Sequence, residues 1–176
     1  MSSREERWIK DGRVKPNLYE HNIPPVTRTI PPGETLVVCG PPVDTEGYAY
    51  IRSVVLFDAV AGSVRIEWGL HEASTPDPAA FSLIKKAAGA GADDCPEKGV
   101  SWIVIKTGPE VGRQRFIRAC LDLTEGRQTP LTPPRGAVAT FAVYMELYRP
   151  DSPMAAMYDN AERAAAYPLR GRFEAL

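Results

Sequence analysis

Apolar and polar residues alternate along six segments of the chain, and this period of two is typical of half-buried β-strands. The alternation is clearest over residues 63–71, where one face carries Val64, Ile66, Trp68 and Leu70. Further strands are predicted over residues 35–39, 48–59, 101–106, 114–123 and 137–148.

The links between these segments indicate how the strands are arranged. Ala61 and Gly62 form a short turn, so segments 48–59 and 63–71 are predicted to pair as a hairpin. Residues 72–99 form a long insertion, in which 79–88 has the composition of one or two helical turns. Because no helix separates most of the strands, the fold class is predicted as all-β, an antiparallel β-sandwich or barrel.

Both ends of the chain differ from this pattern. Seven prolines fall between residues 16 and 42, too many for a helix or a central strand, so residues 1–33 are predicted to be an extended, Pro-rich N-terminal arm. At the other end, Ser152 and Pro153 are suited to begin a short C-terminal helix that runs to about Ala166. An isolated helix of this length needs a surface to pack on.

Three parts are therefore predicted: an arm over 1–33, a β-sandwich domain over 34–149 and a helical appendage over 150–176. The arm and the helix both carry apolar side chains that a solvated linker does not need. The predicted partner-binding residues are Trp8, Tyr19, Ile23, Val26, Ile30, Met154, Met157 and Tyr158.

Composition narrows the classes of function. A net charge of −1 supplies no field that attracts nucleic acid, and no apolar run reaches the ~20 residues of a membrane span. Residues 1–10 are charged and show no secretory signal. Cys39, Cys95 and Cys120 are odd in number and widely spaced, which favours reduced thiols, although one disulfide among the three stays open.

No motif for chemistry stands out. The sequence lacks a phosphate-binding glycine loop, a nucleophile elbow and paired Cys/His metal spacing. His21 and His71 are interpreted as surface histidines, and the acidic cluster Asp93, Asp94 and Glu97 as a solvated loop rather than a calcium site. The sequence therefore predicts no enzyme, cofactor or metal site.

Two further groups have a functional and a structural interpretation. Arginines 113, 115, 118 and 127 could form a basic stripe for phosphate or RNA, but intersubunit salt bridges or solvation explain them better in a chain of balanced charge. Trp68 and Trp102 could stack on sugar rings, yet Trp68 is in phase with the apolar face of its strand and is expected in the core.

Two stretches resemble the small jelly-roll decoration (cement) proteins of tailed-bacteriophage heads: RQRFIRACLDL, residues 113–123, and GAVATFAVYMEL, residues 136–147. The segment IRSVVLFDAVAGSVRIEWGLHEA, residues 51–73, also suits that pattern. The resemblance covers about two thirds of the chain. It implies a jelly-roll-like sandwich, trimeric or otherwise clustered, that sits on capsid shell proteins, and it supplies no catalytic residue.

The leading hypothesis is a structural virion protein that decorates and stabilises a capsid. Its expected partners are the major capsid protein and sister subunits in a homotrimer or other homo-oligomer, without nucleic acid or membrane. The expected location is the capsid surface, after synthesis in the host cytoplasm. The alternatives are a tail, neck or baseplate component, and a carbohydrate-binding module that uses Trp68, Trp102, Tyr48 or Tyr50. A cupin-like enzyme is disfavoured because two distant histidines do not provide its metal ligands.

Overall fold

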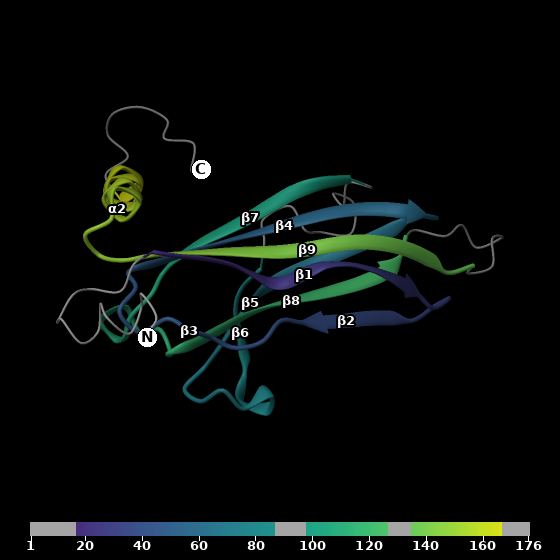
Figure 1. The fold of residues 1–176 in the computed structure, drawn as a ribbon, viewed down its shortest axis with the longest axis horizontal. Helices are drawn as coiled ribbons and strands as arrows, with labels where there is room; N and C mark the ends of the chain where they lie inside the picture. Colours follow the sequence, from purple (N-terminus) through teal and green to yellow (C-terminus); the bar gives the residue numbers. More distant parts are fainter. Residues whose placement is uncertain (1–16, 87–97, 127–134, 167–176) are drawn as a thin grey trace, which may run out of the picture.

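In the computed structural model, two antiparallel sheets pack face to face around one apolar core (Figure 1). The structure describes residues 17–86, 98–126 and 135–166. The first sheet, sheet A, has the order β1 (Leu18–Ile30), β9 (Ala137–Tyr148), β4 (Tyr50–Ala61) and β7 (Lys98–Lys106). Sheet B has the order β2 (Thr35–Cys39), β8 (Phe116–Glu125), β5 (Val64–Ala73) and β6 (Ser82–Lys86), and β3 (Val43–Asp44) also pairs with β8.

The strand order is that of a jelly roll. The first strand pairs with the last, β2 pairs with β8, and the chain passes back and forth between the two sheets. The fold class predicted from the alternation, an antiparallel β-sandwich with a short C-terminal helix, is confirmed.

The predicted hairpin is wrong. Strand β4 pairs with β7 and β9 in sheet A, whereas β5 pairs with β6 and β8 in sheet B. The short link at Gly62 (φ +72°) is therefore a corner at which the chain changes sheets. The segment 79–88 also differs from its prediction, because a single 3₁₀ turn, η1 (Pro78–Ala80), is followed by strand β6.

The predicted arm is a strand of the sandwich over most of its described length. β1 pairs with β9 along the edge of sheet A, and the extended geometry is as expected. Two register shifts fall between His21 and Ile23 and between Ile23 and Val26, around Pro24 and Pro25. Prolines are tolerated there because an edge strand with bulges can lack ladder donors. The predicted boundary at residue 33 is thus wrong for residues 18–30, and residues 1–16 lie outside the described part.

The first bulge turns a polar side chain into the core. Asn22 is buried, its Nδ2 donates to the Pro41 carbonyl at 2.8 Å, and its Oδ1 accepts from the Ala119 amide at 3.0 Å. Gly40 leaves the space for this amide, since a Cβ there would overlap it. Asn22 thus links the edge strand of sheet A to β8 of sheet B.

A disulfide joins Cys39 on β2 to Cys120 on β8, two residues that lie directly opposite each other although 81 positions separate them in the chain. The expectation of reduced thiols is wrong for this pair, because topology, and not spacing, makes them neighbours. Cys95 lies outside the described residues.

Replacing Asn22 with alanine is expected to lower the free energy of unfolding by about 2–4 kcal/mol, because a buried amide N–H and a carbonyl lose their partners. Urea denaturation of the purified protein measures this. Thr29→Ala, at an exposed position on the same strand, is the matched control and should change stability by less than about 0.5 kcal/mol. Equal losses in both variants would contradict the bridging role of Asn22.

Reduction of the Cys39–Cys120 disulfide is expected to release two thiols per chain and to lower stability by about 2–4 kcal/mol. Thiol titration of denatured protein before and after reduction gives the count, and denaturation with and without reductant gives the energy. The Cys39→Ala/Cys120→Ala variant should have the stability of the reduced protein and should not respond to reductant. An unchanged thiol count would show that this bond is absent.

Candidate interaction surfaces

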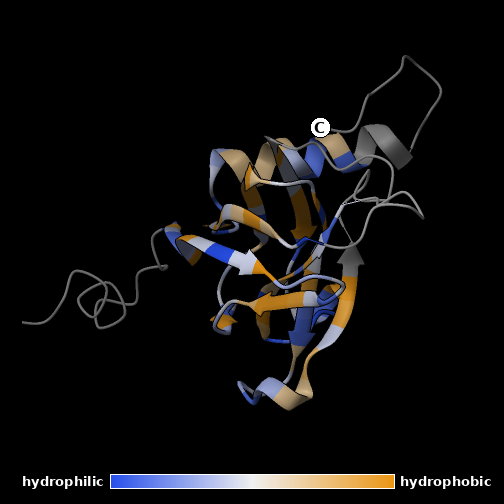
Figure 2. Cartoon of the chain, turned by 90° about the vertical axis from the view of Figure 1, so that its right-hand side faces the viewer, coloured by the Kyte–Doolittle hydropathy of each residue, from blue (hydrophilic) through white to orange (hydrophobic). Residues whose placement is uncertain are grey.

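Helix α2 (Pro153–Ala166) covers one end of the outer face of sheet A and is held there by its own chain (Figures 1 and 2). Ala155 is fully buried against Tyr50 and Tyr148, and Met154 and Tyr158 pack on the same cluster. Asn17 Nδ2 donates to Ser152 Oγ at 3.3 Å, and this hydrogen bond holds the start of the helix against the residue before β1.

A hydrogen bond and an ion pair stabilise the contact between α2 and sheet A at its solvent-exposed side. The Tyr50 hydroxyl donates to Asp159 Oδ1 at 2.6 Å, and Lys106 Nζ lies 3.4 Å from the same oxygen. Burial, followed by the hydrogen bond to Asp159, raises the pKa of Tyr50 above its ordinary value, so the phenol stays protonated and donates. The helix is therefore an integral part of this subunit.

The structure places the eight predicted partner-binding residues in different surroundings. Ile23 and Ile30 belong to the core of this chain and Val26 packs against that core, which corrects their assignment to an external contact. Met154 and Tyr158 pack beneath α2, so their assignment is corrected in the same way. Two of the predicted residues remain exposed, Tyr19 on β1 and Met157 on α2. Trp8 lies outside the described residues.

An exposed apolar patch lies beyond the helix on the outer face of sheet A. It is defined here as Val54, Leu56, Val100 and Trp102. Leu56 lies directly opposite Val100, and Val54 lies opposite Trp102, on the paired strands β4 and β7. The exposed fractions are 46% for Leu56, 58% for Val100 and 46% for Trp102. Directly opposite side chains contact one another, so these four form one surface.

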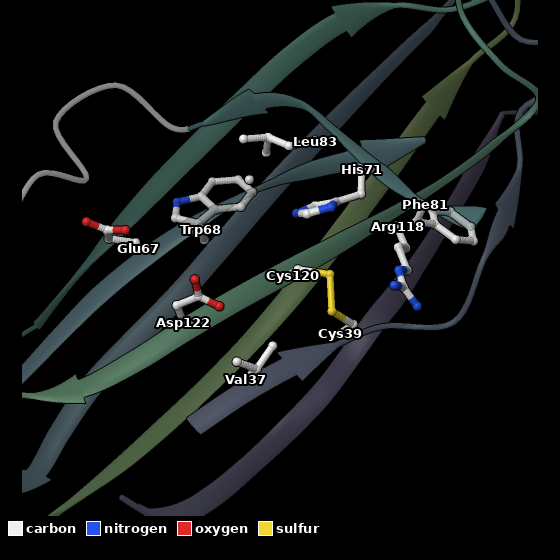
Figure 3. A pocket seen from close by; sticks show the side chains of 11 residues that line it. Val37, Cys39, Glu67, Trp68, His71, Phe81, Leu83, Arg118, Cys120 and Asp122 are labelled. Atoms are coloured by element: carbon white, nitrogen blue, oxygen red, sulfur yellow. A yellow bond between two sulfur atoms is a disulfide. The ribbon is translucent and has the colours of Figure 1, made fainter. Parts of the chain in front are cut away.

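An open hollow of about 310 Å³ lies on sheet B, lined by residues of β2, β8, β5 and β6 (Figure 3). The disulfide lies in its middle, with Val37 and Leu83 on opposite sides. Gly69, which also lines the hollow, is directly opposite Cys120. Figure 3 shows Glu67 and Asp122 at one end and Arg118 with Phe81 at the other. The hollow therefore has an acidic end, a basic end and apolar sides.

The basic end is built around Arg118. Its guanidinium lies 4.3 Å from the centre of the Phe81 ring, and its Nη2 donates to the Pro78 carbonyl at 3.1 Å. His71 is the residue opposite Arg118 on β5. Partial burial, and then the positive charge of Arg118, lower the pKa of His71, so its imidazole is neutral at pH 7.

The other candidates from the sequence have structural surroundings. Arg113 pairs with the buried Glu72 at 3.7 Å, and Arg115 pairs with Asp44 at 2.8 Å and Glu46 at 2.9 Å, so these salt bridges lie within the chain and not between subunits, which corrects the expectation from the sequence. Arg127, Asp93, Asp94 and Glu97 lie outside the described residues.

The aromatic residues proposed for sugar stacking are mostly in the interior. Trp68 is buried, and its indole N–H donates across the core to Ser101 Oγ at 3.1 Å. Tyr48 and Tyr50 are buried as well, which leaves Trp102 as the exposed member of that group of four. The described residues contain no group of three or more His, Cys, Asp and Glu that could hold a metal ion.

Sequence reasoning missed both surfaces. Leu56 is out of phase with the buried residues Val55 and Phe57 of its strand, but the pairing that puts Val100 opposite it follows from the topology. The hollow draws on four strands that are far apart in the chain, so no local pattern marks it. A usable signal is the alternation itself, because apolar residues out of phase with the core indicate a surface that another molecule covers.

Lowering the pH below about 6.5 is expected to destabilise the fold through His71. Its pKa is lower when folded than the ordinary value of 6.5, so the unfolded chain takes up the proton first and stability falls as the pH decreases. His71→Gln should weaken this pH dependence, whereas His21→Gln is the control and should retain it. Denaturation midpoints between pH 5 and 7.5 measure the effect, and identical profiles for wild type and His71→Gln would contradict it.

The chain resembles solved structures of virus particles in fold. No family model matches its sequence, and no curated protein matches it either. A chain in the structure of infectious bursal disease virus Gx strain is similar over 75% of this chain with a TM-score of 0.51 and 8% identity. A chain of the VP2 subviral particle of the same virus is similar over 78%, with a TM-score of 0.50 and 7% identity.

The match spans about a third of the length of those proteins, 31% and 34% respectively. No helix in the described part of the chain is long and apolar enough to span a membrane. At this identity the similarity shows the fold alone: the chain has a β-sandwich like those in the infectious bursal disease virus structures.

Proposed function

We propose that this chain is a structural protein of a virus particle and that it acts by binding neighbouring subunits rather than by catalysis. The observation that carries the proposal is the jelly-roll sandwich, whose fold resembles chains in structures of infectious bursal disease virus and its subviral particle. Jelly rolls also occur in lectins and cupins, so surface features have to distinguish these roles.

The apolar patch favours a binding protein. Val54, Leu56, Val100 and Trp102 stand beside a helix that covers the other end of the same face. Burying each such side chain in a contact contributes on the order of 1.5–3 kcal/mol before ordering costs, and a rigid sheet adds little ordering cost. Tryptophan in such a position is a frequent centre of binding energy.

The more specific proposal is a decoration protein that stabilises a capsid shell. Its partners are then the major capsid protein and sister copies of this chain, in a trimer or another homo-oligomer. A weak contact repeated around a symmetric shell becomes stable through multivalency. The charged clusters around Tyr50 and Arg115 support a structural role, since their members pair with one another and hold the helix and the β3 region in place.

Mass spectrometry of purified virus particles tests the location. The chain should be present in a fixed ratio to the most abundant shell protein and should remain through gradient purification. Finding it only among the soluble proteins of the infected cell would overturn the virion assignment. A tail location would instead give a few copies per particle.

Trp102→Glu is expected to weaken association with the shell or with sister copies by about 30-fold or more, because a charge replaces an apolar contact at its centre. Sedimentation velocity of the purified protein and co-sedimentation with particles measure this. Val111→Glu, which changes an exposed valine of the 3₁₀ turn η2 (Pro109–Val111), is the matched control. Unchanged association for Trp102→Glu, with the fold intact by circular dichroism, would rule out this patch.

A further inference from the structure

The hollow on sheet B has two charged ends at a defined separation. Arg118 and Asp122 point outward from the same strand, four residues apart, which corresponds to about 13 Å at ~3.3 Å per residue. Glu67 lies directly opposite Asp122 on β5 and adds a second carboxylate to the acidic end. A ligand that satisfies both ends needs opposite charges about 13 Å apart.

The middle of the hollow suits an apolar group. Gly69 has no side chain and pairs with Cys120, so the disulfide and bare backbone line the centre. Val37 and Leu83, with exposed fractions of 60% and 48%, stand on either side. The neutral imidazole of His71 next to Cys120 adds no charge there. A small aliphatic side chain fits between the two charged ends (Figure 3).

We propose that this hollow binds an extended peptide segment with a basic residue, an aliphatic residue two positions on and an acidic residue two positions after that, and that residues 7–11 of a second copy of this chain supply it. In a strand, alternate side chains point to one side and every fourth residue is ~13 Å away, which matches the spacing of the two ends.

The sequence RWIKD at residues 7–11 has this pattern. A segment bound antiparallel to β8 would place Arg7 at Asp122 and Glu67, Ile9 over the disulfide, and Asp11 at Arg118. Arg118 has N–H donors beyond the one that Pro78 accepts, so it can also bind a carboxylate. The ends complement each other in charge, and each ion pair is at the rim, where it sets register and specificity.

The choice of a second copy as the occupant rests on the proposed function, in which sister subunits meet in a shell. The recognition of a peptide by the hollow does not rest on the proposed function, because peptide binding can be tested on the purified protein alone. A subunit bound in this way would be linked to its neighbour through sheet B, on the face opposite the apolar patch.

A labelled peptide with the sequence of residues 1–16 tests the proposal by fluorescence anisotropy. It is titrated with the full chain carrying Arg7→Ala and Asp11→Ala, whose own segment lacks both charges and so competes only weakly for the hollow. The peptide should bind this protein, and adding Asp122→Lys should weaken binding about tenfold. A peptide carrying Arg7→Glu should then regain binding to the Asp122→Lys protein. Rising salt should weaken the wild-type pairing, as expected for charges at a rim.

The outcomes separate this inference from the proposed function. Absence of binding, or equal binding with and without Asp122→Lys, would overturn the hollow as the site, whatever happens in particles. Failure of the charge exchange to restore binding would overturn the pairing of Arg7 with Asp122. Trp102→Glu, on the opposite face, should leave peptide binding unchanged, and loss of binding in that variant would assign the peptide to sheet A instead.

Discussion

The two sheets depend on a buried amide that joins them at the edge of the sandwich. Asn22 satisfies a donor on β8 and a carbonyl after β2, and it occupies the space that Gly40 leaves empty. Its inward direction comes from the bulge in β1, which breaks the alternation of that strand. The irregular edge strand thus adds a polar link between the sheets to the packing of the apolar core.

Local patterning predicted the elements well and their partners poorly. The strands β2 and β9 have the predicted bounds, and α2 begins at the predicted proline, because period and capping are properties of neighbouring residues. Pairing depends on which sheet each strand joins, and the tight turn at Gly62 looked like a hairpin although it is a corner between sheets.

The same limit explains the errors about the N-terminus and the cysteines. Proline content argued correctly against a central strand, but it does not exclude an edge strand, where missing donors are tolerated. The burial of Ile23 and Ile30 follows from pairing with β9, which lies more than 100 residues further along the chain and outside any local window. The candidate surfaces were missed for this reason too, since Leu56 and Val100 are neighbours only in the folded sheet.

Formation of the Cys39–Cys120 disulfide depends on the pairing of β2 with β8. Its two sulfur atoms meet only when β2 and β8 pair in the native register, and a slip by one residue would turn one cysteine to the other face of the sheet. β2 and β8 are far apart in the chain, so the bond fixes a long-range pairing of the jelly roll. The oxidised bond therefore marks molecules in which β2 and β8 have met in the native register.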